Sequence, residues 1–195
     1  MTADDALALL RHADMLEALP RTGWITSRVP SPESIAAHSY GVAFTVMLLL
    51  DRIAARTPPP TVDRGRALEM ALLHDLGEAI LTDIPSPVKR FAGREAMKAA
   101  ERRAVAHMTD SADPRYLALY DEYSAATTLE SRVVHAADKI QLFVKASQYG
   151  AAGFAGVERF WSGGDDDAGL PEARELLDRL RAHHAEGTWP SGDWE

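Results

Sequence analysis

The sequence contains no cysteine. Disulfide frameworks, zinc–thiolate sites and thiol nucleophiles are therefore all excluded. It also lacks a long hydrophobic run, because the longest nearly apolar stretch, Val42 to Leu50, includes Thr45 and ends at Asp51. A membrane-spanning helix needs about 20 apolar residues. The first residues are acidic where a secretory signal would be basic and then apolar, so we expect a cytoplasmic protein that does not enter membranes.

Basic residues are also in deficit, because 21 Lys and Arg face 29 Asp and Glu, for a formal net charge of −8. Long nucleic acids bind basic surfaces that release counterions, so they are poor candidate partners. A small phosphorylated substrate is not excluded, because a bound divalent cation reverses the local sign of the charge. The seven histidines and many carboxylates are ligand types that such cations use.

The chain length and composition fit one globular domain, with 195 residues of which 46% are hydrophobic and 26% charged. We expect this domain to span residues 1–185 and to be followed by a polar tail over 186–195. The tail contains Trp189 and Trp194. We favour a loose end over a strap that docks on the body or on a second subunit.

Helical periodicity dominates the sequence, and no segment shows a convincing strand alternation. Pro20 ends the first apolar run, Pro58–Pro60 ends the second, and Asp63 is a candidate N-cap for the third. The pattern predicts helices over residues 7–19, 33–55, 63–80, 94–109, 114–124, 128–148, 153–161 and 171–185. The expected fold class is all-α, a compact bundle of mostly medium-length helices.

Four potential metal ligands lie on three of these predicted helices: His38, His74, Asp75 and Asp138. The dipeptide His-Asp is by itself a weak signal. However, His74 and Asp75 lie inside the apolar stretch Ala71 to Leu76, and Asp138 lies in a similar one. Buried charges are normally paired or bound to a metal, so these side chains predict a metal site with open positions for water. A structural salt bridge to Lys139 or Lys145 is the alternative for Asp138.

Glu78 follows His74 by four residues and Asp75 by three, which places its carboxylate one turn further on the same helical face. A divalent ion lowers the pKa of bound water, and a nearby carboxylate can shuttle the proton of that water. The arrangement therefore indicates hydrolysis, with an exposed helix carboxylate as the alternative for Glu78. His107 and His135 raise the question of a second metal, for which we favour an ordinary surface or supporting role.

Together these motifs make the chain similar to a known family. The order His…His-Asp…Asp resembles the HD-domain metal-dependent phosphohydrolases, and in particular the small HD-domain 5′-deoxynucleotidases. The resemblance covers about residues 20–150 in the same order and at similar intervals. It rests on the segments Arg21–Trp24, Pro32–Tyr40, His74–Ile80, Thr82–Lys89 and Ala137–Lys139.

The resemblance implies an all-helical domain, usually a homodimer, that removes the 5′-phosphate from deoxyribonucleoside monophosphates with one divalent ion. Carried over by motif, the metal ligands are His38, His74, Asp75 and Asp138, and the catalytic carboxylate is Glu78. Such a ligand set suits manganese, cobalt, zinc, iron or magnesium, and the sequence does not distinguish them.

For the substrate, the resemblance implies that Trp24 orients the sugar and helps to select against a 2′-hydroxyl. Part of the pocket would be formed by Asp83, Ile84, Pro85 and Ser86. Arg21 is the candidate phosphate contact. Some members place this arginine directly before the tryptophan, where this chain has Gly23, so Arg28 and Lys89 are alternatives. A core position for Trp24 and a turn-forming role for Asp83 are the structural alternatives.

Two other functions stay open at this level. One is a phosphohydrolase of a different nucleotide, such as an alarmone, a cyclic nucleotide or a specialised metabolite phosphate. The other is a non-catalytic module in which the metal pins helices together and the protein binds a ligand or a partner. Glu78 and the polar residues that follow it count against the module, because a scaffold does not require them.

Overall fold

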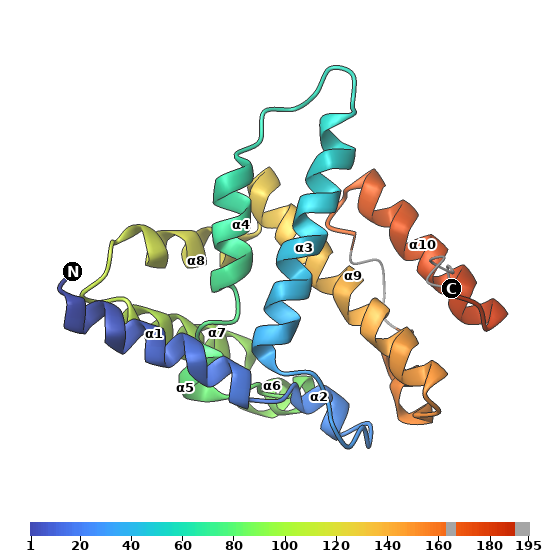
Figure 1. Ribbon diagram of the computed structural model, residues 1–195, viewed down its shortest axis with the longest axis horizontal. Coiled ribbons are helices and arrows are strands. Elements are labelled where there is room, and N and C mark those ends of the chain that lie inside the picture. Colours follow the sequence, from blue (N-terminus) through green and yellow to red (C-terminus); the bar gives the residue numbers. More distant parts are fainter. Residues whose placement is uncertain (163–166, 190–195) are drawn as a thin grey trace.

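The computed structural model describes residues 1–162 and 167–189, and within these ranges the regular structure is helical (Figure 1). An isolated antiparallel bridge joins Pro20 to Ser34. The expected all-α bundle is thereby confirmed. The elements are α1 (Ala3–Ala18), α2 (Thr22–Ile25), α3 (Ile35–Ala54), α4 (Arg64–Leu73), α5 (Glu78–Leu81), α6 (Ser86–Ala92), α7 (Arg94–Met108), α8 (Arg115–Ala125), α9 (Leu129–Ala151), the 3₁₀ helix η1 (Ala155–Phe160) and α10 (Pro171–Glu186).

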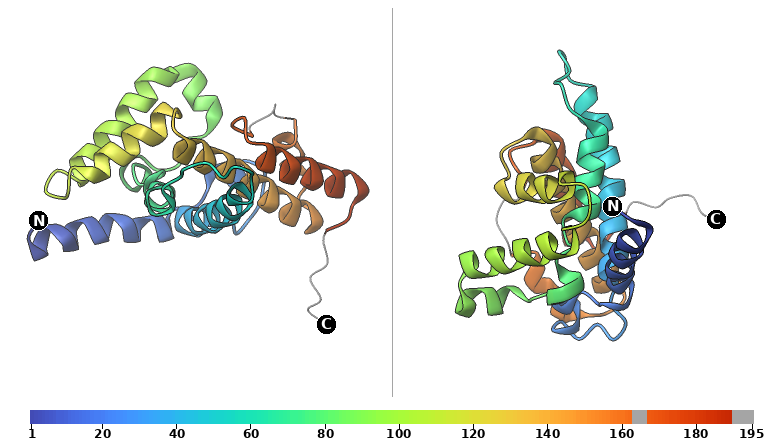
Figure 2. Two further views of the ribbon diagram at one scale, coloured as in Figure 1. Left: turned by 90° about the horizontal axis from the view of Figure 1, so that it is seen from above. Right: turned by 90° about the vertical axis from the view of Figure 1, so that its left-hand side faces the viewer.

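The two longest helices, α3 and α9, pack against each other at the centre of the molecule (Figure 1). Helices α4, α8 and α10 pack around this pair, and α1 packs on α3, α5 and α7. The main core is formed by apolar side chains such as Leu49, Met70, Phe143 and Leu177. Figure 2 shows that α6 and the start of α7 extend away from this core.

Local capping explains where several helices begin. Ser34 accepts a hydrogen bond from the Ala37 amide at the start of α3, and the expected N-cap Asp63 accepts one from the Arg66 amide at the start of α4. Thr128 closes a capping box at the start of α9. These caps fix the chain direction of the helices that carry the candidate site.

The helix predicted over residues 63–80 is wrong, because these residues do not form one continuous helix. α4 ends at Leu73, and α5 begins at Glu78 after a turn. Within the turn the backbone bonds join residues three apart, as in Leu76 N to Leu73 O and Glu78 N to Asp75 O, both 3.0 Å. At Gly77 a Cβ atom would lie only 3.2 Å from the Glu101 carbonyl of α7. Close packing of α7 therefore accompanies the break.

Other boundaries also differ from the sequence pattern. The short helices α2 and α6 were not predicted, and residues 155–160 form a 3₁₀ rather than an α-helix. α6 begins at Ser86 despite Pro87, because proline fits the first helical turn, where its missing N–H has no intrahelical partner. Helix α9 runs on to Ala151, beyond its expected end.

The expected tail falls only partly within the described chain. α10 ends at Glu186, and Gly187 follows in the left-handed conformation typical of a helix C-terminus. Trp189 is exposed, whereas residues 190–195, including Trp194, lie outside the described residues. Across the helices that the structure describes, none combines the length and the hydropathy needed to cross a bilayer.

Candidate active site

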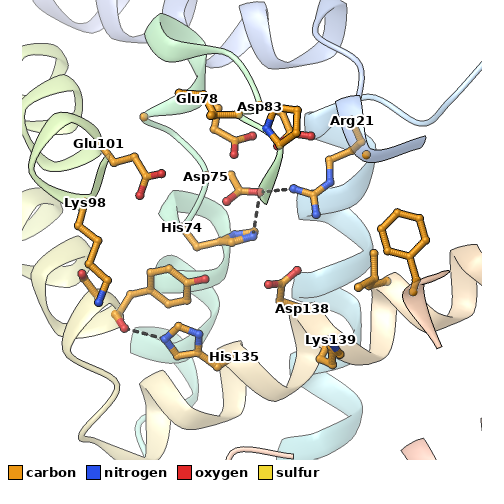
Figure 3. Close-up of a pocket in the computed structure, with 18 of the residues that line it drawn as sticks. Arg21, His74, Asp75, Glu78, Asp83, Lys98, Glu101, His135, Asp138 and Lys139 are labelled. Carbon is orange, nitrogen blue, oxygen red and sulfur yellow. Dashed lines mark hydrogen bonds and ion pairs between the residues drawn. The ribbon is translucent and has the colours of Figure 1, made fainter. Parts of the chain in front are cut away.

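The four predicted metal ligands come from three separate segments and meet in space. His38 lies in the first turn of α3, His74 and Asp75 lie in the turn between α4 and α5, and Asp138 lies in the middle of α9. His38 Nε2 is 3.2 Å from Asp138 Oδ1 and 3.5 Å from Asp75 Oδ2. His74 Nε2 is 3.2 Å from Asp75 Oδ2 and 3.4 Å from His38 Nε2. Figure 3 shows His74, Asp75 and Asp138 pointing toward one another.

Both imidazoles are oriented by a hydrogen bond on the far side of the ring. His38 Nδ1 donates to Gln141 Oε1 at 2.6 Å, and His74 Nδ1 donates to the Ala71 carbonyl at 2.7 Å. Because each of these acceptors is an oxygen that cannot donate, the neutral rings carry their proton on Nδ1. Each Nε2 is then the ring nitrogen that faces the two carboxylates, and it can bind a metal once it has given up its proton.

The donor set fits a divalent metal ion. Ligand atoms of His38, His74 and Asp75 lie within 4.8 Å of one another, and Asp138 adds a second carboxylate beside His38. The imidazoles are sealed from solvent, whereas the side chains of Asp75 and Asp138 are 16% and 34% exposed. Two imidazole nitrogens and two carboxylate oxygens are ligands that borderline and hard divalent metals accept. The exposed side of the cluster leaves room for water or substrate.

The protonation of the cluster is set by competition between burial and neighbouring charge. Burial by itself would lower the pKa of His74, but the adjacent Asp75 carboxylate outweighs it and raises this pKa to about 9. Burial would raise the pKa of Asp75, but His74, Arg21 and His38 hold it well below its usual range. The pKa of Asp138 is lowered to about 2, because hydrogen bonding and charge from His38 overcome burial. Both carboxylates are therefore ionised at neutral pH.

A cavity of about 940 Å³ opens on this cluster. Such a volume lies at the upper end of the range typical of small-molecule sites. Most of the predicted substrate and catalytic residues line it, namely Arg21, Trp24, Glu78, Asp83, Ile84 and Pro85. Figure 3 shows Arg21, Glu78 and Asp83 around Asp75. The side chain of Ser86 lies outside the described residues.

Arg21 is the cation that the structure brings to the cluster among the three considered from sequence. Its Nη1 donates to Asp75 Oδ2 at 3.2 Å, and four carboxylates around it raise its pKa further above the ordinary arginine value although burial opposes this. Arg28 is exposed and does not line the cavity. The Lys89 side chain lies outside the described residues.

Trp24 is both a core residue and part of the cavity wall. It is 1% exposed, its Nε1 donates to Glu33 Oε1 at 3.0 Å, and its ring packs on Phe160 and Tyr149. The indole is therefore held in one position and does not present an open face to solvent. Asp83 is also tied down, because its carboxylate accepts hydrogen bonds from the Thr22 amide at 2.7 Å and from the Thr22 hydroxyl at 3.1 Å.

Of the two histidines considered for a second metal, His135 lines the same cavity as the cluster and His107 does not. His107 is exposed on α7. His135 donates from Nε2 to the Tyr123 carbonyl at 2.8 Å and stacks on the Tyr123 ring with centroids 4.2 Å apart. Among the residues that the structure describes, neither joins a group of three potential metal ligands.

Sequence reasoning missed the side chains that support the cluster from behind. Gln141 contacts His38, and Glu33 contacts both Gln141 and Trp24. Gln141 lies three residues after Asp138, on the same face of α9. This spacing could have identified it from the sequence. Glu33 is next to the α3 cap and carried no such signal, because its partners are remote in sequence.

Comparison with known proteins agrees with this geometry. A model of the HD domain family matches residues 13–160. A 5′-deoxynucleotidase of Xenopus laevis is 31% identical over 147 residues, which are 73% of this chain and 68% of the relative. A 5′-deoxynucleotidase of Schizosaccharomyces pombe is 30% identical over 160 residues, which are 76% of each chain.

Solved structures extend the likeness to the fold. A conserved hypothetical protein from Pyrococcus furiosus is 35% identical and superposes with a TM-score of 0.79, over 90% of this chain and 99% of that one. The family match covers most of the chain, and it includes all four members of the imidazole and carboxylate cluster. The protein therefore belongs to the HD-domain family.

Proposed function

We propose that this protein is a metal-dependent phosphohydrolase that removes the 5′-phosphate from deoxyribonucleoside 5′-monophosphates. The observation that carries the proposal is the convergence of two imidazoles and two carboxylates on the wall of a cavity that also contains Glu78 and Arg21. The names of the Xenopus and Schizosaccharomyces relatives support this reaction.

In this proposal His38 Nε2, His74 Nε2, Asp75 and Asp138 hold one divalent ion. When bound, such an ion offsets the phosphate charge and lowers the pKa of water at the site. The orientation of the two rings supports the assignment, because their Nδ1 atoms are engaged elsewhere. Manganese, cobalt, zinc, iron and magnesium are all compatible with the donor set.

Glu78 is the proposed acid–base residue. It begins α5, directly after the turn that carries His74 and Asp75, and it lines the cavity. Its carboxylate accepts a proton from the attacking water and returns it to the 5′-oxygen as the phosphorus–oxygen ester bond breaks. The products are inorganic phosphate and the deoxyribonucleoside, so atoms and charge balance without a further reactant.

The charge of the cavity supports an anionic substrate. Five basic side chains line it, which are Arg21, Arg90, Lys98, Lys139 and Arg159. Five acidic side chains also line it, which are Asp75, Glu78, Asp83, Glu101 and Asp138. The lining is therefore balanced, in contrast to the −8 of the whole chain. A divalent ion would make it net positive, which favours a phosphate dianion.

The sugar is proposed to lie between Trp24 and the segment Asp83–Ser86. Because Glu33 and two aromatic rings hold the indole in place, this part of the wall cannot retreat from a larger sugar. A 2′-hydroxyl would then lose its hydration without gaining a hydrogen bond, which discriminates against ribonucleotides.

A second candidate is a nucleotide that carries additional phosphate, such as an alarmone. The cavity volume and the basic side chains of Arg90 and Lys98, on α6 and α7, favour it. These two cations provide the charge that a second phosphate group would require. Cyclic nucleotides and the non-catalytic module are the remaining alternatives from sequence.

We expect phosphate release from deoxyribonucleoside 5′-monophosphates only after metal is restored to the stripped protein. The assay measures inorganic phosphate from deoxy- and ribonucleoside 5′-monophosphates, 3′-monophosphates, cyclic nucleotides and alarmones with manganese, cobalt, zinc, iron or magnesium. Preference for the deoxy 5′-set supports the proposal. Hydrolysis confined to alarmones or cyclic nucleotides would show that the substrate is a different nucleotide. Metal binding without any hydrolysis would favour the non-catalytic binding module.

We expect Glu78→Gln to lower kcat by about 10²- to 10⁴-fold, because the amide cannot accept the water proton. Metal content and thermal stability should stay near wild type, since Glu78 is not among the proposed ligands. Glu95→Gln, at an exposed position of α7, is the matched control and should keep full activity. A Glu78→Gln enzyme with near-normal kcat would contradict the assignment.

We also propose that the protein forms a homodimer through an exposed face of α3. Tyr40, Phe44, Met47 and Leu48 repeat at helical spacing, and Tyr40 is 72% exposed. A contiguous apolar stripe of this kind is typical of interaction surfaces. A second copy would cover it.

Light scattering should give about twice the 21.3 kDa of one chain. Phe44→Glu should shift the protein toward the monomer, because a carboxylate in the interface would lose its hydration. Leu72→Glu, at an exposed position of α4, should leave the mass unchanged. A monomeric wild-type protein at micromolar concentration would refute the dimer.

A further inference from the structure

Behind the site, a line of buried hydrogen bonds runs from His38 to a charged side chain on the far side. His38 Nδ1 donates to Gln141 Oε1 at 2.6 Å, and Gln141 Nε2 donates to Glu33 Oε2 at 2.8 Å. The Glu33 side chain is only 3% exposed, although it carries a charge. We propose that Glu33 and Gln141 are positioning residues that fix the tautomer of His38. This inference rests on the proposed metal site.

The direction of each bond follows from the chemistry of its acceptor. An ionised carboxylate can only accept, so the NH₂ group of Gln141 must face Glu33. The carbonyl oxygen of the same amide must then face His38, and it too can only accept. His38 therefore holds a proton on Nδ1, which leaves Nε2, on the side of Asp75 and Asp138, as the nitrogen that can bind metal. The charge on Glu33 thus decides, through one amide, which ring nitrogen is free to bind metal.

Glu33 is itself held from three further directions. Trp24 Nε1 donates to its other oxygen, Oε1, at 3.0 Å, and Lys145 Nζ lies 3.9 Å from Oε2. Its own backbone N–H donates to the Tyr149 hydroxyl at 2.8 Å. Both carboxylate oxygens therefore have hydrogen-bond donors, as a buried carboxylate needs. Trp24, the proposed sugar contact, and His38 therefore share one anchor.

The backbone of α3 also makes room for this arrangement. Gly41 lies nearly one turn after His38, and a Cβ atom there would come within 2.9 Å of Gln141 Cγ and 3.3 Å of Gln141 Nε2. Glycine weakens a helix interior, so its presence here is explained by the side chain that crosses it. Any larger residue would displace the amide that orients His38.

Exchanging the carboxylate of Glu33 and the amide of Gln141 separates a positioning role from a merely structural one. In Glu33→Gln, the new amide has one oxygen, which Trp24 already uses, and its NH₂ group then faces the NH₂ group of Gln141. Gln141 must turn over and present NH₂ to His38. The ring is then driven to the other tautomer, with its proton on Nε2. In the double variant Glu33→Gln with Gln141→Glu, the bonds from Trp24 to residue 33, from residue 33 to residue 141 and from His38 Nδ1 to residue 141 can all form again, although Lys145 loses its carboxylate partner.

The experiment measures the Kd for Mn²⁺ by competition with a chelator, and the presence of a proton on His38 Nδ1 by ¹⁵N NMR of the metal-free protein. We expect Glu33→Gln and Gln141→Leu to weaken binding by about 10- to 100-fold. Gly41→Ala should act in the same direction while keeping every polar group. The double variant should return to within about threefold of wild type, which a loss of folding would not permit. Gln148→Leu, at an exposed position of the same helix, is the control.

Unchanged Mn²⁺ affinity and an unchanged His38 tautomer in Glu33→Gln would overturn the proposal. So would a double variant that binds as weakly as the single ones. Because neither readout involves turnover, a wild-type protein that binds Mn²⁺ but hydrolyses no nucleotide would refute the proposed function and leave this inference intact. A wild-type protein with no affinity for Mn²⁺ and no proton on His38 Nδ1 would overturn it.

Discussion

The Asp75 carboxylate is the point at which the structure is most constrained. One of its oxygens lies 3.2 Å from His74 Nε2, 3.2 Å from Arg21 Nη1 and 3.5 Å from His38 Nε2. These partners come from separate parts of the chain. A largely buried carboxylate needs compensating charge or hydrogen bonds. The meeting of both imidazoles and Arg21 at this oxygen supplies that compensation.

The break between α4 and α5 positions Glu78 in the same cavity as Asp75. A single continuous helix would have kept Glu78 on the axis of α4. The turn at His74–Gly77 instead starts α5 at the edge of the cavity, where Glu78 lines the same wall as Asp75. Gly77 favours this turn, because a Cβ atom there would lie 3.2 Å from the Glu101 carbonyl and α7 would have to move slightly to admit it. The fold and the proposed chemistry thus depend on the same short turn.

Local signals explain why most of the helices could be predicted. Caps such as Asp63 and stops such as Pro20 act within a few residues, so they can be read from the sequence. The break at His74 could not, because the apolar periodicity continues through Leu76 and Ile80, and the close approach of α7 at Gly77 exists only in the folded chain. Propensity and pattern cannot register packing between segments that are distant in sequence.

The same distinction applies to the site. The proposed metal ligands could be picked out from the sequence because polar side chains in apolar helices are costly and therefore conspicuous. Their support could not, since Gln141 and Glu33 are 108 residues apart in sequence and meet only in the folded chain. Trp24 is the opposite case. The family resemblance implies a sugar contact for it, and the sequence left a core position open as the alternative. The structure shows that the indole is buried and bonded to Glu33.

The most direct test of the account is anomalous diffraction from crystals of the full chain grown with Mn²⁺. The account predicts one strong anomalous peak enclosed by His38 Nε2, His74 Nε2, Asp75 and Asp138, with Gln141 still bonded to His38 Nδ1. An empty cluster in crystals of an enzyme that requires Mn²⁺ for hydrolysis, or an ion bound by other residues, would contradict it.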